Sequence, residues 1–284
     1  MYYDSHMHTS FSFDSEAAPR DQALRAAALG LPGICFTDHM DYVWPVCEPA
    51  ADGSPVLSAD GHTVLSGQAY LFDADAYFGE LSALREEFAD LDIRIGIELG
   101  CQAELSGLLA ETLAAHTYDY VIGSTHFAEG MDPYYAEYFT GRTNPAGYRV
   151  FFERILENLE AFDDIDALGH LDYVTRYAIP GNGEYVWTDY REVFEAILRH
   201  LIAKDICLEV NTAGFKAGLG RPNPGAEVLR FYRELGGRLI TLGADAHRPE
   251  HIAYAFDQIG ELLKDCGFTE YQVFRGRKAE AYPL

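Results

Sequence analysis

The stretch IRIGIEL, residues 93–99, gives the clearest indication of the fold. It is a short apolar run with a lone carboxylate, Glu98, near its end. Its β-branched residues and short length predict a buried strand of a parallel sheet. Comparable runs recur along the chain. The strands predicted in this way are 2–5, 33–38, 93–99, 118–125, 165–170, 206–211 and 238–245, with a possible late strand at 271–276.

The segments between these strands have helical periodicity. Apolar residues at three-and-four spacing predict helices over 19–30, 76–90, 103–115, 145–162, 187–203, 223–236 and 250–266. A strand followed by a helix, repeated about seven times, indicates a parallel α/β fold. Because no GxGxxG fingerprint follows the first strand, a closed barrel of about seven strands fits better than an open sheet.

The domain organisation is predicted to be simple. No linker rich in proline, glycine or serine divides the chain, so we expect one domain over residues 1–284. The stretch at about 44–77 is the exception, since it has turn residues throughout and little periodicity. Long loops of this kind are usually functional, and we expect a lid or insertion over the site.

Composition excludes several classes of protein. The net charge is −24, from 45 acidic and 21 basic residues, and this field repels polyanions, so we expect no nucleic-acid partner. Neither a membrane-length apolar run nor a signal peptide is present, which predicts a cytoplasmic protein without membrane contact. The five cysteines contain no CxxC pair, so neither a disulfide framework nor a thiolate zinc site is indicated.

Histidine and carboxylate residues gather where the predicted strands end. His6 and His8 stand two residues apart, and side chains at this spacing on a strand point to the same side. Taken alone, this pair equally fits two solvated histidines. The further strand-end residues are Asp38, His39, Glu98, His126, His170, Asn211, Asp245 and His247. Because the carboxyl ends of barrel strands converge on one face, the pattern predicts a metal site there.

The residue types narrow the choice of metal. Imidazole and carboxylate without thiolate suit divalent zinc, manganese or iron. The predicted ligands outnumber the four positions of one tetrahedral ion, so two or three ions are implied, and Glu98 could bridge two of them. A hydroxide between two metals is the nucleophile that such sites generate at neutral pH. We expect the remaining histidines to be surface or internally satisfied residues: His62, His116, His200 and His251.

Taken together and in order, the motifs resemble the polymerase and histidinol phosphatase (PHP) superfamily. They are HxH, TDH, a lone Glu, STH, GHxD and GADAH, and they run from His6 to His247. The chain length, the long segment after TDH, Asp14 and the LEVNTAG stretch are similar to the monofunctional histidinol-phosphatase branch. The resemblance implies a distorted (β/α)7 barrel of parallel strands with its metal site at their carboxyl ends.

The resemblance also implies a ligand set and a reaction. The first ion would be bound by His6, His8, Glu98 and Asp245, the second by Glu98, His126 and His170, and the third by Asp14, His39 and His247. The implied reaction is hydrolysis of L-histidinol phosphate to L-histidinol and phosphate, in histidine biosynthesis. The catalytic residues would be Glu98, Asp38, His39, Asp245 and His247.

Asp38 has three possible roles. It could orient an imidazole, protonate the leaving alkoxide, or only cap the following segment. Asp172 equally fits a solvated loop carboxylate or a residue that supports a ligand.

Phosphate needs cationic donors near the strand ends. The candidates are Arg176, Lys216, Arg221 and Arg248, any of which could be a surface cation, and Asn211 could bond the substrate amine or close a turn. We predict that the small phosphorylated substrate contacts at least one of the cations. The pocket for the alcohol could include Tyr42, Trp44 and Glu48, and the run at 134–139 could be a wall of the site or plain packing.

Two other functions fit the same residues. The first is a phosphoesterase acting on a nucleoside monophosphate or bisnucleotide with the same metals. The second is a metal-binding module without catalytic activity, which the intact set of ligands disfavours.

Overall fold

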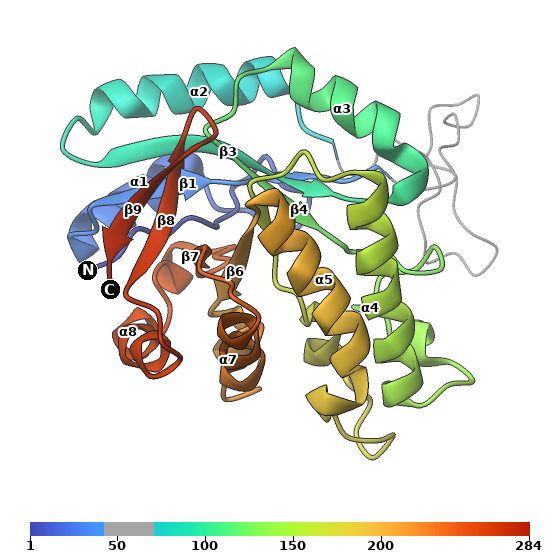
Figure 1. The fold of residues 1–284 in the computed structure, drawn as a ribbon. Coiled ribbons are helices and arrows are strands. Elements are labelled where there is room, and N and C mark those ends of the chain that lie inside the picture. Colours follow the sequence, from blue (N-terminus) through green and yellow to red (C-terminus); the bar gives the residue numbers. More distant parts are fainter. Residues whose placement is uncertain (43–70) are drawn as a thin grey trace, which may run out of the picture.

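The computed structural model describes residues 1–42 and 71–284 and contains a curled, seven-stranded parallel sheet (Figure 1). The strand order is β1-β3-β4-β5-β6-β7, and β2 pairs with β3. The strands are Gly33–Phe36 (β1), His39–Met40 (β2), Asp92–Gly100 (β3), Tyr120–Ser124 (β4), Ala167–Leu168 (β5), Cys207–Asn211 (β6) and Ile240–Gly243 (β7). Their residues are almost all buried, as expected for parallel strands covered on both faces.

The N-terminal segment 4–8 closes the sheet into a barrel. It lies between β1 and β7, the two edges of the sheet, and forms hydrogen bonds with both. The amide of Cys35 in β1 donates to the carbonyl of Asp4 (2.9 Å), and the amide of Ser5 donates to the carbonyl of Leu242 in β7 (2.9 Å). The prediction of a distorted barrel of parallel strands is therefore confirmed.

The N-terminal segment 4–8 differs from the strand predicted at 2–5. Asp4 forms a single parallel bridge with Ile34, and Met7 forms another with Ala246. Because these are isolated bridges, the segment has no continuous ladder and is not a regular strand.

Helices surround the sheet (Figure 1). They are Pro19–Leu29 (α1), Ala74–Glu87 (α2), Ser106–Ala115 (α3), Asn144–Ala161 (α4), Arg191–Lys204 (α5), Ala213–Lys216 (α6), Ala226–Glu234 (α7) and Phe256–Asp265 (α8). Short 3₁₀ helices cover Ala103–Leu105 (η1), Ala136–Phe139 (η2), Tyr173–Tyr177 (η3), Trp187–Tyr190 (η4) and Pro249–His251 (η5). The helix α1 shows why the boundaries fall where they do: proline occupies its first turn, and Gly30 ends it with a φ of 69°.

Two predicted helices have wrong starting points. The helix predicted over 250–266 begins only at Phe256, because Ala253 and Ala255 adopt left-handed φ angles of 53° and 58° that interrupt it. The helix predicted over 223–236 begins at Ala226. Asn223, the first residue of the predicted helix, instead exchanges two backbone hydrogen bonds with Asn211, at 2.8 and 2.9 Å.

The predicted insertion at 44–77 ends too late. Its last residues belong to α2, whose N-cap Asp73 accepts a hydrogen bond from the amide of Ala76 (3.1 Å). Residues 44–70 lie outside the described residues, as do the candidate pocket residues Trp44 and Glu48.

The late strand predicted at 271–276 belongs to a separate antiparallel hairpin, formed by Glu270–Arg275 (β8) and Lys278–Pro283 (β9). Arg94, near the start of β3, is buried and joins the barrel to this hairpin. It donates hydrogen bonds to the carbonyl of Phe274 (2.9 Å) and to the carboxylate of Glu280 (3.1 Å). The hairpin therefore packs at the amino end of the barrel strands, and the carboxyl ends remain available for a site.

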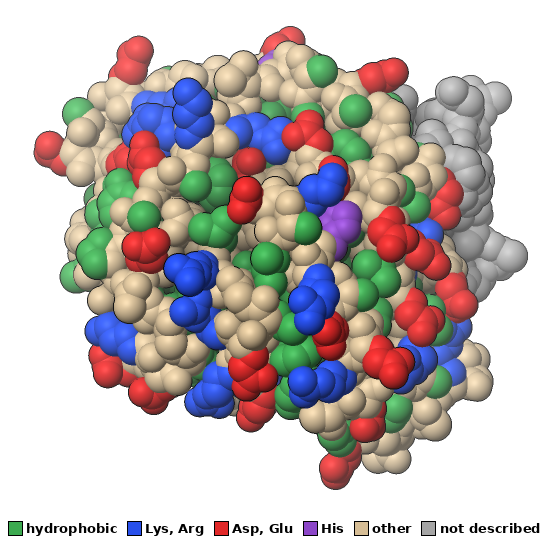
Figure 2. All heavy atoms as spheres, in the orientation of Figure 1, with side chains coloured by type: hydrophobic (Ala, Val, Ile, Leu, Met, Phe, Trp, Pro, Cys, Tyr) green, Lys and Arg blue, Asp and Glu red, His purple; other side chains and the backbone are tan. Residues whose placement is uncertain are grey.

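The surface carries both signs of charge. Figure 2 shows lysine and arginine side chains interspersed with acidic ones over the face seen in Figure 1. Among residues 1–42 and 71–284, no helix has the length and apolar character needed to cross a membrane. The expectations of a cytoplasmic location and of no nucleic-acid partner stay predictions. In the described part of the chain, the cysteines are buried and free, namely Cys35, Cys101, Cys207 and Cys266.

Candidate metal centre

The carboxylate of Glu98, near the end of β3, lies at the centre of the histidine cluster and is fully buried. Its Oε1 atom lies 2.9 Å from Nε2 of His170 and 3.3 Å from Nε2 of His126. Its Oε2 atom lies 3.1 Å from Nε2 of His6, 3.1 Å from Nδ1 of His39 and 3.3 Å from Nε2 of His8. The two oxygens therefore face two different groups of imidazoles, as required of a carboxylate that bridges two cations.

The N-terminal segment 4–8 and the end of β7 form one side of the cluster. The Nε2 atoms of His6 and His8 lie 3.0 Å apart, so their side chains face the same point, as their spacing predicts. Oδ1 of Asp245 lies 3.4 Å from Nε2 of His8 and 3.8 Å from Nε2 of His6. Asp245 adopts a left-handed φ of 53°, which costs a non-glycine residue about 1 kcal/mol. Such local strain is typical of functional sites.

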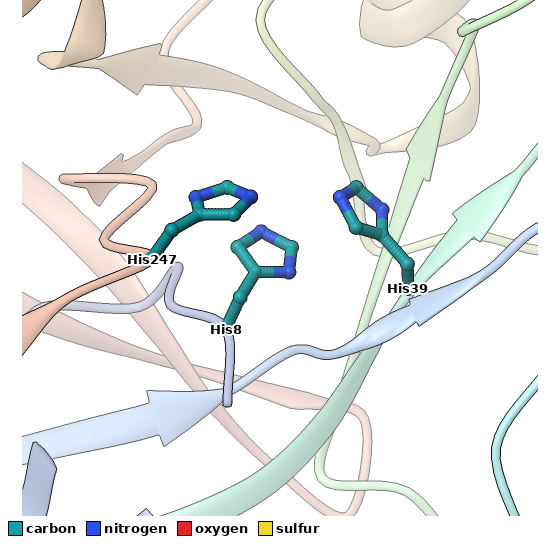
Figure 3. Close-up of side chains that lie close together, drawn as sticks. All are labelled: His8, His39 and His247. Atoms are coloured by element: carbon teal, nitrogen blue, oxygen red, sulfur yellow. The ribbon is translucent and has the colours of Figure 1, made fainter. Parts of the chain in front are cut away.

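Three histidines from distant parts of the chain stack at the outer side of the cluster. Figure 3 shows the ring of His8 between the rings of His39 and His247. The ring centroids lie 4.2 Å apart for His8 and His39, and 4.1 Å apart for His8 and His247. Oδ2 of Asp14 lies 3.0 Å from Nε2 of His247 and 3.7 Å from Nε2 of His39. The structure therefore brings together the three residues predicted for the third ion.

The donor atoms of this cluster fit divalent cations. Within residues 1–42 and 71–284, four overlapping groups have ligand atoms within 4.8 Å of one another: His6, His8 and Glu98; Glu98, His126 and His170; His8, His39 and His247; and His39, Asp41 and His126. Nδ1 of His39 and Oδ2 of Asp41 are buried and lie 3.3 Å apart, but they form no hydrogen bond of regular geometry among the described residues. A buried imidazole nitrogen and a carboxylate oxygen placed in this way are donor atoms that suit a divalent cation.

A cavity of about 440 Å³ opens above the cluster. Its lining combines candidate ligands with aromatic residues. The first set is Asp14, His39, Asp41, His126, His170, Asp245 and His247, the second is Phe13, Phe127, Tyr134, Tyr135, Tyr173 and Tyr177, and Asp132 and Arg176 complete the lining.

Comparison with known proteins identifies the family. The model of the PHP domain family matches residues 4–213, which contain most of the cluster. This chain belongs to the PHP domain family. The histidinol-phosphatase of Lactococcus lactis subsp. lactis (strain IL1403) is 30% identical over 284 residues, covering 98% of this chain and 96% of the relative. The probable histidinol-phosphatase of Clostridium acetobutylicum is 27% identical and covers 94% of each chain.

A solved structure of the family has the same fold throughout. It is the histidinol phosphate phosphatase from Lactococcus lactis subsp. lactis Il1403, complexed with zinc, L-histidinol and phosphate. Its TM-score to this chain is 0.85 at 29% identity, and the match covers 99% of this chain and 100% of the other. A putative histidinol phosphatase from Listeria monocytogenes has a TM-score of 0.71 at 20% identity, which shows the shared fold.

Two of the predicted cationic residues lie close to the candidate ligands, and one of them, Arg176, lines the cavity. Arg176, in η3, donates hydrogen bonds to Oδ2 of Asp245 (2.9 Å), to Asn223 (2.9 Å) and to Asn211 (3.0 Å). Lys216, in α6, donates to the backbone carbonyl of Asp245 (3.1 Å). Both side chains line a second hollow that contains His247 and Asp14. These cations therefore lie beside the candidate ligands.

The other predicted substrate-binding residues lie elsewhere. Asn211 is fully buried and holds Arg176 and Asp245 in place, so its role is to position them. Arg221 donates to Asp172 (2.6 Å) and does not line the cavity. Arg248 is exposed on a separate surface hollow.

Asp172 is fully buried and also accepts a hydrogen bond from Asn223, a partner of Arg176. Its position therefore favours a supporting role over a solvated loop carboxylate.

Asp38 supports the centre without facing the cavity. Its carboxylate is fully buried and accepts hydrogen bonds from the amide of Thr9 (2.6 Å) and from the hydroxyl of Ser12 (2.7 Å). The same hydroxyl lies 3.1 Å from Nδ1 of His8. The structure therefore favours the interpretation that Asp38 orients an imidazole, through Ser12, over proton donation to a leaving alkoxide.

Sequence reasoning missed Glu209, an inward-facing residue in the middle of β6. Its Oε1 atom lies 2.5 Å from Nδ1 of His6, and its Oε2 atom accepts a hydrogen bond from the amide of His170 (2.7 Å). A side chain at Gly243 would collide with both His6 and Glu209, so the glycine allows their approach. The available signal was the carboxylate in LEVN, two residues before Asn211.

Asp41 was also missed, although it follows TDH by two residues. Its Oδ1 atom lies 2.7 Å from Nδ1 of His126, and its Oδ2 atom lies 3.3 Å from Nδ1 of His39. Gly100, on the neighbouring strand, leaves room for this carboxylate, because a Cβ atom there would collide with it.

The segment 134–139 has both of the roles considered for it, a wall of the site and packing in the core. Tyr134 and Tyr135 line the cavity, whereas Tyr138 and Phe139 are buried in the core. Tyr42 does not line the cavity, and its hydroxyl lies 2.8 Å from that of Thr112 in α3.

The buried charges of the centre depend on one another. Burial alone would raise the pKa of Glu98, but the nearby imidazoles of His6, His39 and His126 lower it well below its usual value. Burial lowers the pKa of His126, but the charges of Asp41 and Glu98 outweigh burial and raise it to about 10. In the metal-free protein, protons on imidazoles therefore neutralise the carboxylates. Burial also raises the pKa of one cavity carboxylate outside the cluster, that of Asp132, to about 6.

Metal affinity should rise with pH. The pKa of His126 is about 10 in the metal-free protein, so at neutral pH a metal ion must displace its proton. Between about pH 6 and pH 8, each displaced proton should strengthen binding up to about tenfold per pH unit. Competition with a chelator across this range, with calorimetry in two buffers to count released protons, measures the effect. His200→Gln, outside the centre, should release as many protons as the native chain. An affinity independent of pH would contradict the charge assignment.

Replacing Glu209 should weaken metal binding without removing a ligand. Glu209→Gln keeps the shape of the side chain but loses the charge that orients His6, and changes of this kind typically cost about 10- to 100-fold in metal affinity. Chelator competition on the purified variant gives the value. The matched control is Glu192→Gln, at an exposed position in α5, which should bind metal like the native protein. Native affinity in Glu209→Gln would show that this carboxylate does not support the centre.

Proposed function

We propose that this protein is a metal-dependent phosphoric monoester hydrolase that converts L-histidinol phosphate to L-histidinol and phosphate. The observation that carries the proposal is the placement of Glu98, whose two oxygens face separate groups of imidazoles below a cavity lined by Arg176. Support comes from the relatives named histidinol-phosphatase and from the similar solved structure that holds zinc, L-histidinol and phosphate.

Two or three divalent cations, of zinc, manganese or iron, would bind in the cluster. The residues that would hold them are His6, His8, Asp14, His39, Glu98, His126, His170, Asp245 and His247. Bound cations of this kind neutralise the charge of a phosphate ester and lower the pKa of water. Asp41 is a further candidate ligand, because it shares a group of close donor atoms with His39 and His126.

The side chains of the chain itself bind and orient the ester. Arg176 is held by Asp245, Asn211 and Asn223, so its guanidinium is fixed before substrate arrives. Three of its five N–H donors have these partners, and the remaining donors suit phosphate oxygens. Lys216, which lines the same second hollow, adds a second positive charge. Together they offset the repulsion that a chain of net charge −24 exerts on an anionic substrate.

The reaction needs strong stabilisation of charge. Spontaneous hydrolysis of phosphate monoesters is extremely slow, and enzymes accelerate such reactions by up to about 10²¹-fold. Buried charges that are fixed in advance are worth more than solvated ones, because they need no reorganisation during the reaction. Glu98, Asp245 and their histidines are almost completely inaccessible to solvent, as this mechanism requires.

Phosphate release from a panel of esters tests the function. We expect the metal-loaded protein to hydrolyse L-histidinol phosphate at least about a hundredfold more efficiently than nucleoside monophosphates, bisnucleotides or sugar phosphates. Glu98→Gln should lose at least about a hundredfold of this activity, because a neutral amide bridges two cations poorly.

The control for the variant is Glu87→Gln, which removes an exposed carboxylate paired with Arg20 and should leave the activity unchanged. A preference of about a hundredfold for a nucleotide would show that L-histidinol phosphate is not the substrate. Metal-loaded protein that is inert on every ester would favour a metal-binding module without catalytic activity. Native turnover by Glu98→Gln would contradict the role given to Glu98.

A further inference from the structure

The cavity contains one carboxylate that the proposed reaction does not use, that of Asp132. This residue follows β4 and lines the cavity wall together with four tyrosines, Tyr134, Tyr135, Tyr173 and Tyr177. Its Oδ1 atom accepts hydrogen bonds from the amide of Tyr134 (2.8 Å) and from the hydroxyl of Tyr173 (3.2 Å). These contacts fix the carboxylate group in one orientation.

The second oxygen of Asp132 has no hydrogen-bond partner in the part of the chain that the structure describes. No lysine, arginine or histidine of residues 1–42 and 71–284 forms an ion pair with it, and it belongs to none of the four groups of close ligand atoms. The other acidic residues of the cavity differ, because Asp14, Asp41 and Asp245 each lie within 3.4 Å of a histidine nitrogen. Asp132 therefore presents a carboxylate oxygen without an ion-pair partner in the described residues beside the substrate space.

The tyrosines beside Asp132 form a continuous aromatic wall. The ring of Tyr177 lies 5.0 Å from that of Tyr173 and 5.5 Å from that of Tyr134. Tyr134 is 63% exposed and contacts Tyr135, at 5.2 Å, on the rim of the cavity. Aromatic faces attract cations, and the attraction grows where water is displaced. A wall of tyrosines around an unpaired carboxylate is therefore suited to an organic cation.

The charge of the substrate determines whether a carboxylate in this position favours or opposes binding. A phosphate monoester is an anion, and a free carboxylate in the same cavity repels it. The repulsion becomes an advantage only when the alcohol part of the ester carries a positive charge that the carboxylate can bind. L-Histidinol has a primary ammonium group near its hydroxyl, and esters of neutral alcohols have none.

We propose that Asp132 binds the ammonium group of the leaving alcohol through its free Oδ2 atom, and that this contact selects amino-alcohol phosphates over esters of neutral alcohols. The inference rests on the proposed function and adds a substrate-binding residue to it. Asp132 acts on the alcohol side of the ester, while Arg176 and Lys216 act on the phosphate side.

Asp132→Asn tests the contact, because the amide keeps the shape and loses the charge. Three esters are compared. They are L-histidinol phosphate, p-nitrophenyl phosphate, and the phosphate ester of 3-(imidazol-4-yl)propan-1-ol, which differs from L-histidinol phosphate only in lacking the ammonium group. For L-histidinol phosphate, kcat/KM should fall about 10- to 100-fold, mainly through a higher KM, as for loss of a hydrogen bond to a charged group. For the two esters without an ammonium group it should change less than about threefold.

A binding measurement and two further variants complete the experiment. Titration of the metal-loaded protein with L-histidinol should show weaker binding in Asp132→Asn, while inorganic phosphate binds as in the native protein. Asp132→Ser removes the carboxylate in a second way and should give the same selective loss. Glu137→Gln changes an exposed carboxylate in the same segment and should behave like the native chain.

The outcomes separate this proposal from the proposed function. An equal loss of kcat/KM on all three esters would mean that Asp132 has a structural role. No loss of kcat/KM on any ester would mean that Asp132 does not bind the substrate. Either result overturns the proposal while turnover of L-histidinol phosphate by the native protein upholds the function. If the native protein hydrolyses p-nitrophenyl phosphate but not L-histidinol phosphate, the function fails and the proposal fails with it.

Discussion

The structure depends on one buried carboxylate, Glu98, whose two oxygens face two separate groups of histidines. An isolated charge in this position would be costly, and it is tolerated only because cationic groups surround it. Protons can supply that positive charge in the metal-free chain, and divalent cations can supply it in the loaded one. The same electrostatic requirement therefore links the stability of the barrel interior to the binding of metal.

The barrel makes this arrangement possible by joining segments that are distant in the sequence. The segment 4–8 closes the sheet between β1 and β7, and it places His6 and His8 beside residues that follow β7. At the opposite end, Arg94 and the hairpin β8–β9 close the barrel. One end of the molecule is thus fixed by ion pairs and hydrogen bonds, and the other presents the ligands to the cavity.

The convergence of strand ends in a parallel barrel was sufficient to predict that these histidines and carboxylates lie together, and residues as distant as His8 and Asp245 are 3.4 Å apart. It was insufficient for Glu209, which lies inside a strand, and for Asp132, which lies on a loop. Their roles depend on contacts between side chains that periodicity does not encode. The interruption of the predicted helix at Ala253 and Ala255, before α8, was also missed, because alanine residues seldom adopt left-handed φ angles.

Anomalous diffraction from crystals of the zinc-loaded protein, recorded on both sides of the zinc absorption edge, tests the central claim most directly. The account predicts strong peaks on both sides of the Glu98 carboxylate, one bonded to His6 and His8 and another to His126 and His170. Crystals that contain zinc but show no peak bonded to Glu98, or imidazoles that turn away from it, would contradict the account.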